Sequence, residues 1–356
     1  MDIPAHGAPL LCGCTGEPHA MDDLPVARVF IDKTSHIGDG GFSDVYKGEY
    51  RKVEDGAVVQ VALKRAFPQC GVSGEPLSEC LVRKEAHLYT SLQHPCLVRC
   101  WGSLTLDGRR TLVLDLMRGG TLDKVVARSR AEGRSLPHAF VLFVLRDVAA
   151  ALSYLHGGYG KVGERGARDG TDQLRYYAHG DVQQSNVLLE RPMEDFSTFS
   201  VSPDQGRIAR LGDLGTMRTF IVDQGHHTVP AQEGIYGPFP DVTWPGDAVA
   251  SCPSYTAPEA LANYEWTPES DVWSWGILAF ELIAGKRAWD YTNDTKFTSL
   301  RLKIMHNKVR LAWPDTIPSH FAAVQGLAET TLLRDPAERP LSRQLLDDVN
   351  KLVAQL

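Results

Sequence analysis

Two aspartates and an asparagine lie where predicted strands begin and end in the middle of the chain. Asp181 precedes Asn186 by five residues, and the apolar run 187–189 follows. A second short apolar run, 208–211, leads to Asp213. Each motif alone is also typical of an Asx turn. Taken in order, the carboxylate and amide oxygens suit Mg²⁺ beside a substrate's phosphates, so they predict a magnesium–phosphate site.

A lysine and a glutamate form a second candidate constellation. Lys64 ends an apolar strand-like run, where a lysine commonly reaches from a sheet edge into water. Glu85 shares one face of a predicted helix with three leucines, Leu81, Leu88 and Leu92. A carboxylate on such a face is costly unless a positive group meets it. We therefore expect a Lys64–Glu85 ion pair that leaves the ammonium able to orient phosphates.

Residues 37–45 form a glycine-rich turn between two predicted strands. Gly38, Gly40 and Gly41 allow the backbone to fold tightly over a phosphate and to offer it N–H groups. Glycine turns between strands are common, so this signal alone is weak. Because a strand rather than a helix follows, the turn does not fit a Rossmann dinucleotide site.

The elements that would position these residues fall into two regions. Short strand-like runs punctuated by glycine turns extend from residue 30 to about 114, with one helix among them. After Gly119 and Gly120 long helical patterns dominate, first over 139–156 and later over 271–283. This segregation predicts an α+β protein with a small strand-rich lobe and a larger helical lobe.

Several segments are predicted to lie outside the core. Residues 157–178, 191–206 and 216–250 are polar or rich in glycine and proline, without a sustained period, and are expected to be surface insertions. The first 27 residues are predicted to be a flexible tail. Acidic residues occupy the positions where a signal peptide would be basic and then apolar.

Composition limits the class of protein. The chain has 356 residues, 43% of them hydrophobic and 23% charged, which is typical of a globular protein. A net charge of −7 gives no basic footprint for nucleic acid. The apolar stretch 139–155 is interrupted by Arg146 and Asp147, so no membrane span is predicted. Seven cysteines, an odd number, favour free thiols in a reducing compartment, the cytoplasm, with the nucleus not excluded.

The order of these motifs over about residues 30–356 resembles that of eukaryotic protein kinases. Three further motifs make the resemblance specific: Ala257-Pro258-Glu259, the run Asp271-Val272-Trp273-Ser274-Trp275-Gly276, and Arg339, which matches the arginine that pairs with the glutamate of the first motif. The resemblance implies a bilobal protein-kinase fold, with a β-rich N-lobe at 28–116 and an α-helical C-lobe at 117–356. It also implies a long activation segment at 213–259.

The resemblance assigns roles to the candidate residues. Lys64, held by Glu85, would bind the α- and β-phosphates of ATP, and Asp181 would accept or orient the proton of the substrate hydroxyl. Asn186 and Asp213 would hold Mg²⁺. The other residues matched to the ATP site are Ile37, Gly38, Gly40, Val45, Ala62, Leu114, Asp115, Met117, Thr121 and Leu188.

Within that set, Leu114 matches the gatekeeper position. The backbones of Asp115 and Met117 would bind adenine, which would lie between the side chains of Val45, Ala62 and Leu188. Four other residues match the stack of side chains that aligns the lobes in this family and is anchored on Asp271: Tyr89, Cys100, His179 and Leu214.

Three residues depart from the family pattern. Gly180 replaces the arginine of His-Arg-Asp, which commonly meets an activation-loop phosphate, so we predict activity without that phosphorylation. Gln183 replaces the catalytic-loop lysine, and Cys252 replaces a threonine that contacts it. Their joint change removes one positive charge from the transferring phosphoryl group, which predicts slow or specialised transfer.

Three functions fit this pattern. The leading hypothesis is ATP-dependent phosphorylation of serine or threonine in protein substrates, because residues 253–257 resemble the serine/threonine form. The stretch 273–289 leans towards the tyrosine-kinase-like group of serine/threonine kinases. The alternative is a pseudokinase that binds nucleotide or acts as a scaffold. A small-molecule kinase of the aminoglycoside phosphotransferase type is the third, and Glu259 and Arg339 argue against it.

Overall fold

The computed structural model describes residues 24–40, 42–67, 77–157, 167–168, 174–193, 206–223, 226–228, 252–263, 266–289 and 297–356. The described chain divides into two compact units. Of the described residues, the first unit contains those of 24–93 and 98–116, and the second contains 94–97 and those from 117 onwards. Each unit is described by itself.

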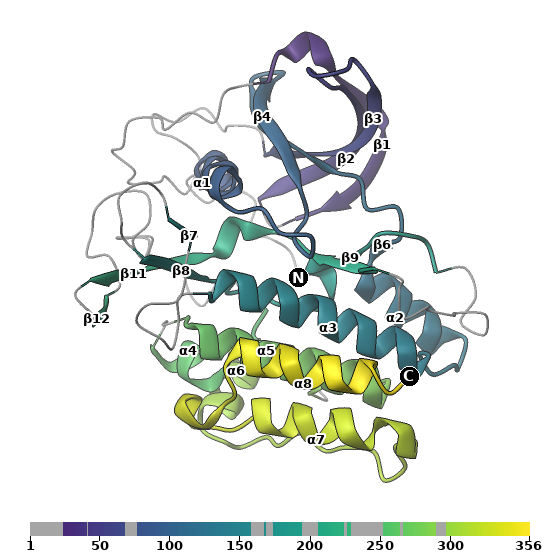
Figure 1. The fold of residues 1–356 in the computed structure, drawn as a ribbon, viewed down its shortest axis with the longest axis vertical. Helices are drawn as coiled ribbons and strands as arrows, with labels where there is room; N and C mark the ends of the chain where they lie inside the picture. Colours follow the sequence, from purple (N-terminus) through teal and green to yellow (C-terminus); the bar gives the residue numbers. More distant parts are fainter. Residues whose placement is uncertain are drawn as a thin grey trace. The chain divides into compact units, whose positions relative to one another are not determined.

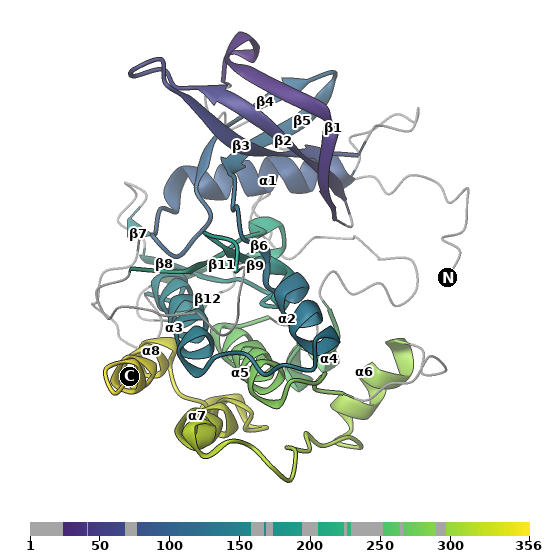
Figure 2. The ribbon, with the colours of Figure 1, turned by 90° about the vertical axis from the view of Figure 1, so that its right-hand side faces the viewer.

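The first unit is a five-stranded antiparallel sheet with one helix. The strand order is β1-β2-β3-β5-β4. The helix α1 (Leu77–Ser91) packs against β3, β4 and β5 (Figures 1 and 2). The strands are β1 (Val29–Asp39), β2 (Ser43–Arg51), β3 (Val58–Ala66), β4 (Cys100–Leu106) and β5 (Arg109–Asp115).

Alternation along these strands builds the core of the sheet. Because successive side chains point to opposite faces, Val61 and Leu63 lie on one face and are fully buried. Leu24 packs against the same cluster, and its N–H donates to the carbonyl of Ser103 at 2.8 Å. The predicted flexible tail is therefore too long, because its last residues already belong to this unit; residues 1–23 lie outside the described chain.

The second unit is mainly helical. Its helices are α2 (Leu122–Ala131), α3 (His138–Leu155), α4 (Pro258–Asn263), α5 (Pro268–Ala284), α6 (Phe297–Met305), α7 (Ala322–Thr331) and α8 (Ser342–Val353). A small sheet, β10-β9-β6, contains β6 (Gly120–Thr121), β9 (Val187–Leu189) and β10 (Ala209–Leu211). Four short 3₁₀ helices also lie here, at Gln184–Asn186, Leu214–Thr216, Ser319–Phe321 and Pro336–Glu338.

Helix α5 is the centre of this unit, as its nearly uniform apolar sequence predicts. Every residue from 270 to 283 is buried. The N–H of Thr267 donates to the Ser270 hydroxyl at 3.2 Å, Pro268 opens the helix, and Gly285 closes it in the left-handed conformation with φ 63°. Trp275 donates from Nε1 to the carbonyl of Leu145 at 2.9 Å, which fixes α5 to α3.

Helix α3 is long and apolar enough to cross a membrane, by length and composition alone. In this unit 67% of it is buried by packing, notably against α8, α5 and β10 (Figure 1). Asp147 interrupts its apolar sequence for a local reason. Its Oδ2 accepts the N–H groups of Ile208 and Ala209, at 2.7 and 3.0 Å, and so holds the start of β10.

The segments expected to be surface insertions contain strands. β7 (Ala167–Arg168) and β8 (Leu174–Ala178) join β11 (Arg218–Asp223) and β12 (His226–Thr228) in a sheet of order β12-β11-β8-β7. Tyr176 and Phe220 stack with ring centroids 4.8 Å apart, and both are buried. The prediction is wrong for these residues, because short strands next to glycine-rich chain give no sustained period. Most of 191–206 and all of 229–250 lie outside the described residues.

Candidate active site

The predicted ion pair is present in the strand-rich unit. Lys64 Nζ lies 2.7 Å from Glu85 Oε2, and the side chains are 13% and 1% exposed. Lys64 extends from β3 and Glu85 from the buried face of α1. Because a carboxylate with almost no contact with water needs a charged partner, the helix and the ammonium position each other.

The other predicted ATP residues of this unit lie on adjoining strands. Gly38 on β1 faces Val45 on β2, and Ala62 on β3 faces Leu114 on β5. Ile37 is on β1, and the N–H of Gly40 donates to the carbonyl of Ser43 at 2.7 Å, which closes the glycine-rich turn. The sheet register therefore brings the predicted loop and strand residues onto neighbouring positions.

Asp115 ends β5 with both its side chain and its N–H engaged. Its Oδ1 accepts the indole N–H of Trp101 at 2.8 Å, and its N–H donates to the carbonyl of Arg99 at 2.9 Å. The guanidinium of Arg99 lies 3.7 Å from the centroid of the Trp101 ring, a contact that sequence reasoning missed.

Three predicted ATP residues belong to the helical unit. Met117 is buried, and its carbonyl accepts the N–H of Gly120 at 3.0 Å. Thr121 on β6 pairs with Leu188 on β9, and Thr121 is also the N-cap residue directly before α2.

The catalytic loop, 179–186, is anchored on one carboxylate at the start of α5. The N–H groups of His179 and Gly180 donate to Asp271 Oδ2 and Oδ1, at 2.6 and 2.9 Å. His156 Nε2 lies 2.9 Å from Oδ2, and Asp271 is 1% exposed. Since a buried carboxylate is tolerated only when hydrogen bonded, the loop conformation and the position of α5 depend on each other.

Gly180 explains one departure from the family pattern. Its φ is +78°, a left-handed conformation that glycine adopts without steric cost. A Cβ at this position would lie 3.1 Å from the carbonyl oxygen of Thr216, in the segment that begins with Asp213. The Thr216 hydroxyl donates to the carbonyl of His179 at 3.1 Å, so the two segments are in direct contact.

Four hydrogen bonds surround the carboxylate of Asp181. Gln183 Nε2 donates to both oxygens, at 2.8 Å each. Asn186 Nδ2 donates to Oδ2 at 2.7 Å and also to the backbone carbonyl of Asp181 at 2.8 Å. The N–H of Cys252 lies 3.3 Å from Oδ1. Burial raises the pKa of Asp181, and the negative charge of Asp213 raises it further.

The residues predicted to hold Mg²⁺ fit a hard cation by their chemistry. Asn186 turns its amide nitrogen to Asp181, which leaves its oxygen as the metal-binding atom. Asp213 takes a left-handed conformation with φ 61° and accepts the N–H of Gly215 at 3.3 Å. The loops are joined because the N–H of Gly212 donates to the carbonyl of Asn186 at 2.9 Å. Carboxylate and amide oxygens are the ligands that Mg²⁺ takes alongside phosphate oxygens.

The predicted Glu259–Arg339 contact is also present. Arg339 donates from its two terminal nitrogens to the two oxygens of Glu259, at 2.7 and 2.9 Å, and its side chain is fully buried. It also donates to the carbonyls of Glu269 and Leu333, and its guanidinium lies 5.1 Å from the centroid of the Trp273 ring. One side chain thus fixes the end of the activation segment to the C-terminal part of the unit.

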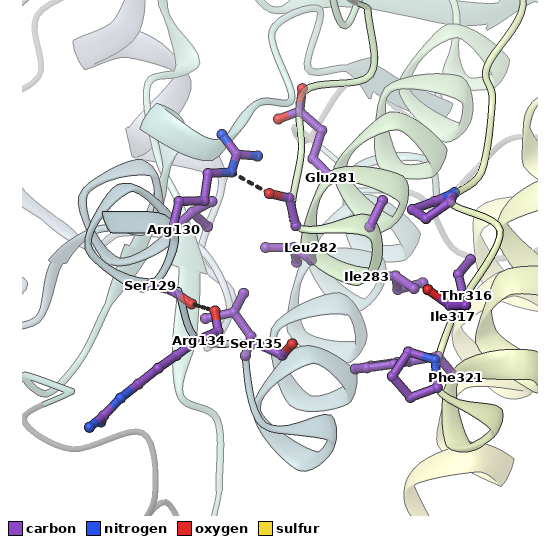
Figure 3. Close-up of a pocket in the computed structure, with 16 residues that line it drawn as sticks. Ser129, Arg130, Arg134, Ser135, Glu281, Leu282, Ile283, Thr316, Ile317 and Phe321 are labelled. Carbon is purple, nitrogen blue, oxygen red and sulfur yellow. Dashed lines mark hydrogen bonds between the residues drawn. The ribbon is translucent and has the colours of Figure 1, made fainter. Parts of the chain in front are cut away.

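A cavity of about 210 Å³ lies elsewhere in the helical unit, bordered by the ends of α2 and α5 and by residues 314–321 (Figure 3). Arg130 donates from Nε to the carbonyl of Gly285 at 2.8 Å across one wall. Glu281 also borders the cavity, and its carboxylate accepts the hydroxyl of Tyr255 at 2.6 Å and the amide of Gln184 at 2.7 Å. None of the predicted ATP, catalytic or metal residues lines this cavity.

A strand-rich unit with a Lys–Glu pair and a helical unit with this catalytic loop define the protein kinase class. The family model described as "Protein kinase domain" matches residues 31–349, so the chain belongs to that family.

Its relatives include proteins named as protein kinases. Serine/threonine-protein kinase BIK1 of Arabidopsis thaliana is 27% identical over 349 residues, covering 93% of this chain and 75% of its own length. Human mitogen-activated protein kinase kinase kinase 11 is 26% identical over 321 residues, which cover 90% of this chain. This chain spans about a third of the latter's length, 31%.

Proposed function

We propose that this protein transfers the γ-phosphate of ATP to serine or threonine hydroxyls of protein substrates. The observation that carries the proposal is the hydrogen-bonded carboxylate of Asp181, which accepts the side-chain amide of Asn186 in the same loop. The carbonyl of Asn186 accepts the N–H of Gly212, which places Asp213 next to this loop. Lys64, held by Glu85, provides the phosphate-binding ammonium in the strand-rich unit. The name of the relative BIK1 supports serine/threonine specificity.

In the proposed mechanism, each residue acts at a stated atom. Lys64 Nζ binds phosphate oxygens of ATP, and Asp181 accepts the proton of the substrate hydroxyl as that oxygen attacks the γ-phosphorus. Asn186 and Asp213 would hold Mg²⁺, which when bound would supply positive charge to neutralise the phosphates. The reaction depends on positioning and electrostatics, so it tolerates the loss of the catalytic-loop lysine at a cost in rate.

Transfer of labelled γ-phosphate from Mg·ATP to mixed protein substrates tests this proposal, with Asp213→Asn run alongside. We expect label on serine or threonine with the unaltered protein and a loss of at least about 10²-fold in Asp213→Asn, because the metal ligand is removed. Nucleotide binding without transfer above that variant would instead make the protein a pseudokinase. Label on tyrosine would contradict the proposed specificity.

We further infer that activity does not require phosphorylation of the activation segment. Gly180 has no side chain with which to bind a phosphate, and its backbone already contacts Asp271. Treatment with a broad-specificity phosphatase, followed by removal of the phosphatase, is expected to leave the transfer rate unchanged. Loss of activity after this treatment would contradict the inference.

Two finer assignments are also proposals. The stretch 273–289 supports placement in the tyrosine-kinase-like group of serine/threonine kinases. A cytoplasmic location is supported by the free thiols of Cys96, Cys100 and Cys252 in the described chain.

A further inference from the structure

The turn between β4 and β5, with the residue after it, contacts three other strands of the sheet. The turn consists of Asp107 and Gly108, whose φ angles are 50° and 72°, and Arg109 is the first residue of β5. Asp107 Oδ2 lies 2.8 Å from Lys33 Nζ on β1. The side chain of Arg109 contacts β2 and β3. This short segment therefore reaches beyond the two strands that it connects.

One guanidinium, that of Arg109, binds two acceptors. Its Nη2 donates to Asp44 Oδ2 at 2.8 Å, and its Nε donates to the backbone carbonyl of Ala66 at 2.5 Å. The hydroxyl of Tyr46 lies 3.5 Å from the same Asp44 oxygen, at the limit of a hydrogen bond. The side chains of Asp44 and Arg109 are only 14% and 16% exposed. Because water screens this pair little, its interaction is stronger than that of a surface ion pair.

The two acceptors lie next to groups that are predicted to bind the phosphates of ATP. Asp44 on β2 pairs with Asp39 on β1, at the last register position before the glycine-rich turn. Ala66 follows Lys64 by two residues on β3. The guanidinium of Arg109 therefore joins the base of the glycine-rich turn to the strand that carries the phosphate-binding ammonium.

We propose that Arg109 is a positioning residue for ATP, because it fixes the glycine-rich turn relative to Lys64 so that both meet the same phosphates. The proposal rests on the kinase function proposed above. Without this guanidinium, β2 keeps its backbone pairing with β1 and β3, but the base of the turn loses a side-chain anchor. Groups that are already in place lose less conformational freedom when a ligand binds. Arg109 therefore acts on the affinity for ATP rather than on the transfer step.

Titration calorimetry of Mg·ATP binding to the full chain tests the proposal. We expect Kd to rise about 10-fold in Arg109→Met, with little change in kcat at saturating ATP. Arg109→Lys is expected to have a smaller effect, because an ammonium keeps the charge beside Asp44 but lacks the planar fork that holds both acceptors. Lys33→Met is the matched control. It removes an ion pair of equal length from the same turn, but there the side chains are 65% and 49% exposed, so Kd should not change.

Asp44→Asn tests the same contact from the other side, since asparagine keeps the shape and removes the charge. We expect Kd to rise in this variant too, and Asp44→Asn combined with Arg109→Met to bind Mg·ATP about as weakly as Arg109→Met alone. If Arg109→Met does not fold, the Kd of Asp44→Asn decides alone.

Urea denaturation of each variant separates positioning from stability. An Arg109→Met protein that unfolds more easily but binds Mg·ATP with an unchanged Kd overturns the proposal, and so do effects of the two substitutions that add in full. If the unaltered protein binds Mg·ATP but transfers no phosphate, the kinase function fails, and the Kd values still decide the role of Arg109. If the unaltered protein does not bind Mg·ATP, both proposals are overturned.

Discussion

Gly276 lies at a position in α5 where the packing leaves no room for a side chain. An added Cβ would overlap the hydroxyl oxygen of Thr331 and lie 2.8 Å from Cγ of Leu332, and Thr331 is fully buried. Alanine is the better helix former by about 1 kcal/mol, so propensity alone favours the substitution. Overpacking a rigid core commonly costs about 1–3 kcal/mol, and we expect it to prevail.

The prediction is that Gly276→Ala lowers the free energy of unfolding, measured by urea denaturation. Gly326→Ala is its control, because Gly326 lies in α7 and has no atom within 4 Å of an added Cβ. We expect Gly326→Ala to be neutral or stabilising. Equal effects of the two substitutions would show that α5 has room at this position.

Apart from the pairs implied by the resemblance to protein kinases, residue pairing is predictable only where the sequence shows a conflict that needs a partner. Glu85 on an apolar helix face requires a cation, and Lys64 at the end of a strand was available, so the pair could be named in advance. Asp147 presents the same conflict, and the adjacent Arg146 donates to its Oδ1 at 2.7 Å. Its Oδ2 accepts backbone N–H groups at 208 and 209, which no side-chain pattern reveals. The Gln183–Asp181 contact depends on backbone geometry in the same way.

At the scale of elements, the catalytic loop depends on the left-handed conformation of Gly180. Alanine there would have an unfavourable φ and a Cβ 3.1 Å from the Thr216 carbonyl. We expect Gly180→Ala to cost about 1–2 kcal/mol of stability, and urea denaturation measures it. Gly206→Ala, with no atom near an added Cβ, is the control and should change stability little.

Long periodic elements were predictable, and short ones were not. The helices over 139–156 and 271–283 correspond to α3 and α5, because burial on most sides requires a sustained apolar sequence. β8 and β11 have only five and six residues, and the sequence on either side of them is largely polar or rich in glycine. The sequence pattern therefore predicts insertions there rather than strands. Their pairing is a long-range property that becomes visible only when the chain is folded.

At the scale of the whole molecule, two histidines link the stability of the helical unit to pH. Burial lowers the pKa of His94 and of His138, and the nearby charges of Arg207 and His320 lower them further. Below the ordinary histidine pKa the unfolded chain therefore binds more protons than the folded one. Their contribution to stability is fully present above about pH 6.5 and is lost as the pH falls from there through the lower pKa of each histidine in the folded protein.

We predict that the melting temperature falls on acidification from about pH 7.5 to about pH 5.5, and that the fall is smaller in His138→Gln. His138 packs edge-on against Phe321 and lies beside His320, so its protonation would place a positive charge in a partly apolar contact. Thermal unfolding at both pH values measures the effect. An equal fall in His138→Gln and the unaltered protein would assign the pH dependence to other groups.

The division into a strand-rich and a helical part was apparent from the change of pattern after Gly119 and Gly120. The contacts that join distant segments were not apparent from periodicity. Arg339 pairs with Glu259, 80 residues away, and that pairing was expected only through the resemblance to protein kinases. Long-range polar contacts leave no local signature, so motif order was the information that predicted them.

The attachment of the catalytic loop to Asp271 has a consequence for protein synthesis. His179 and Gly180 leave the ribosome 92 and 91 residues before the carboxylate that accepts their N–H groups. A nascent chain that ends before α5 already contains Lys64, Glu85 and Asp181, but its loop lacks the anchor that gives it shape. Nascent chains are thus expected to be inactive until α5 has been synthesised. Incomplete molecules would then not phosphorylate other proteins.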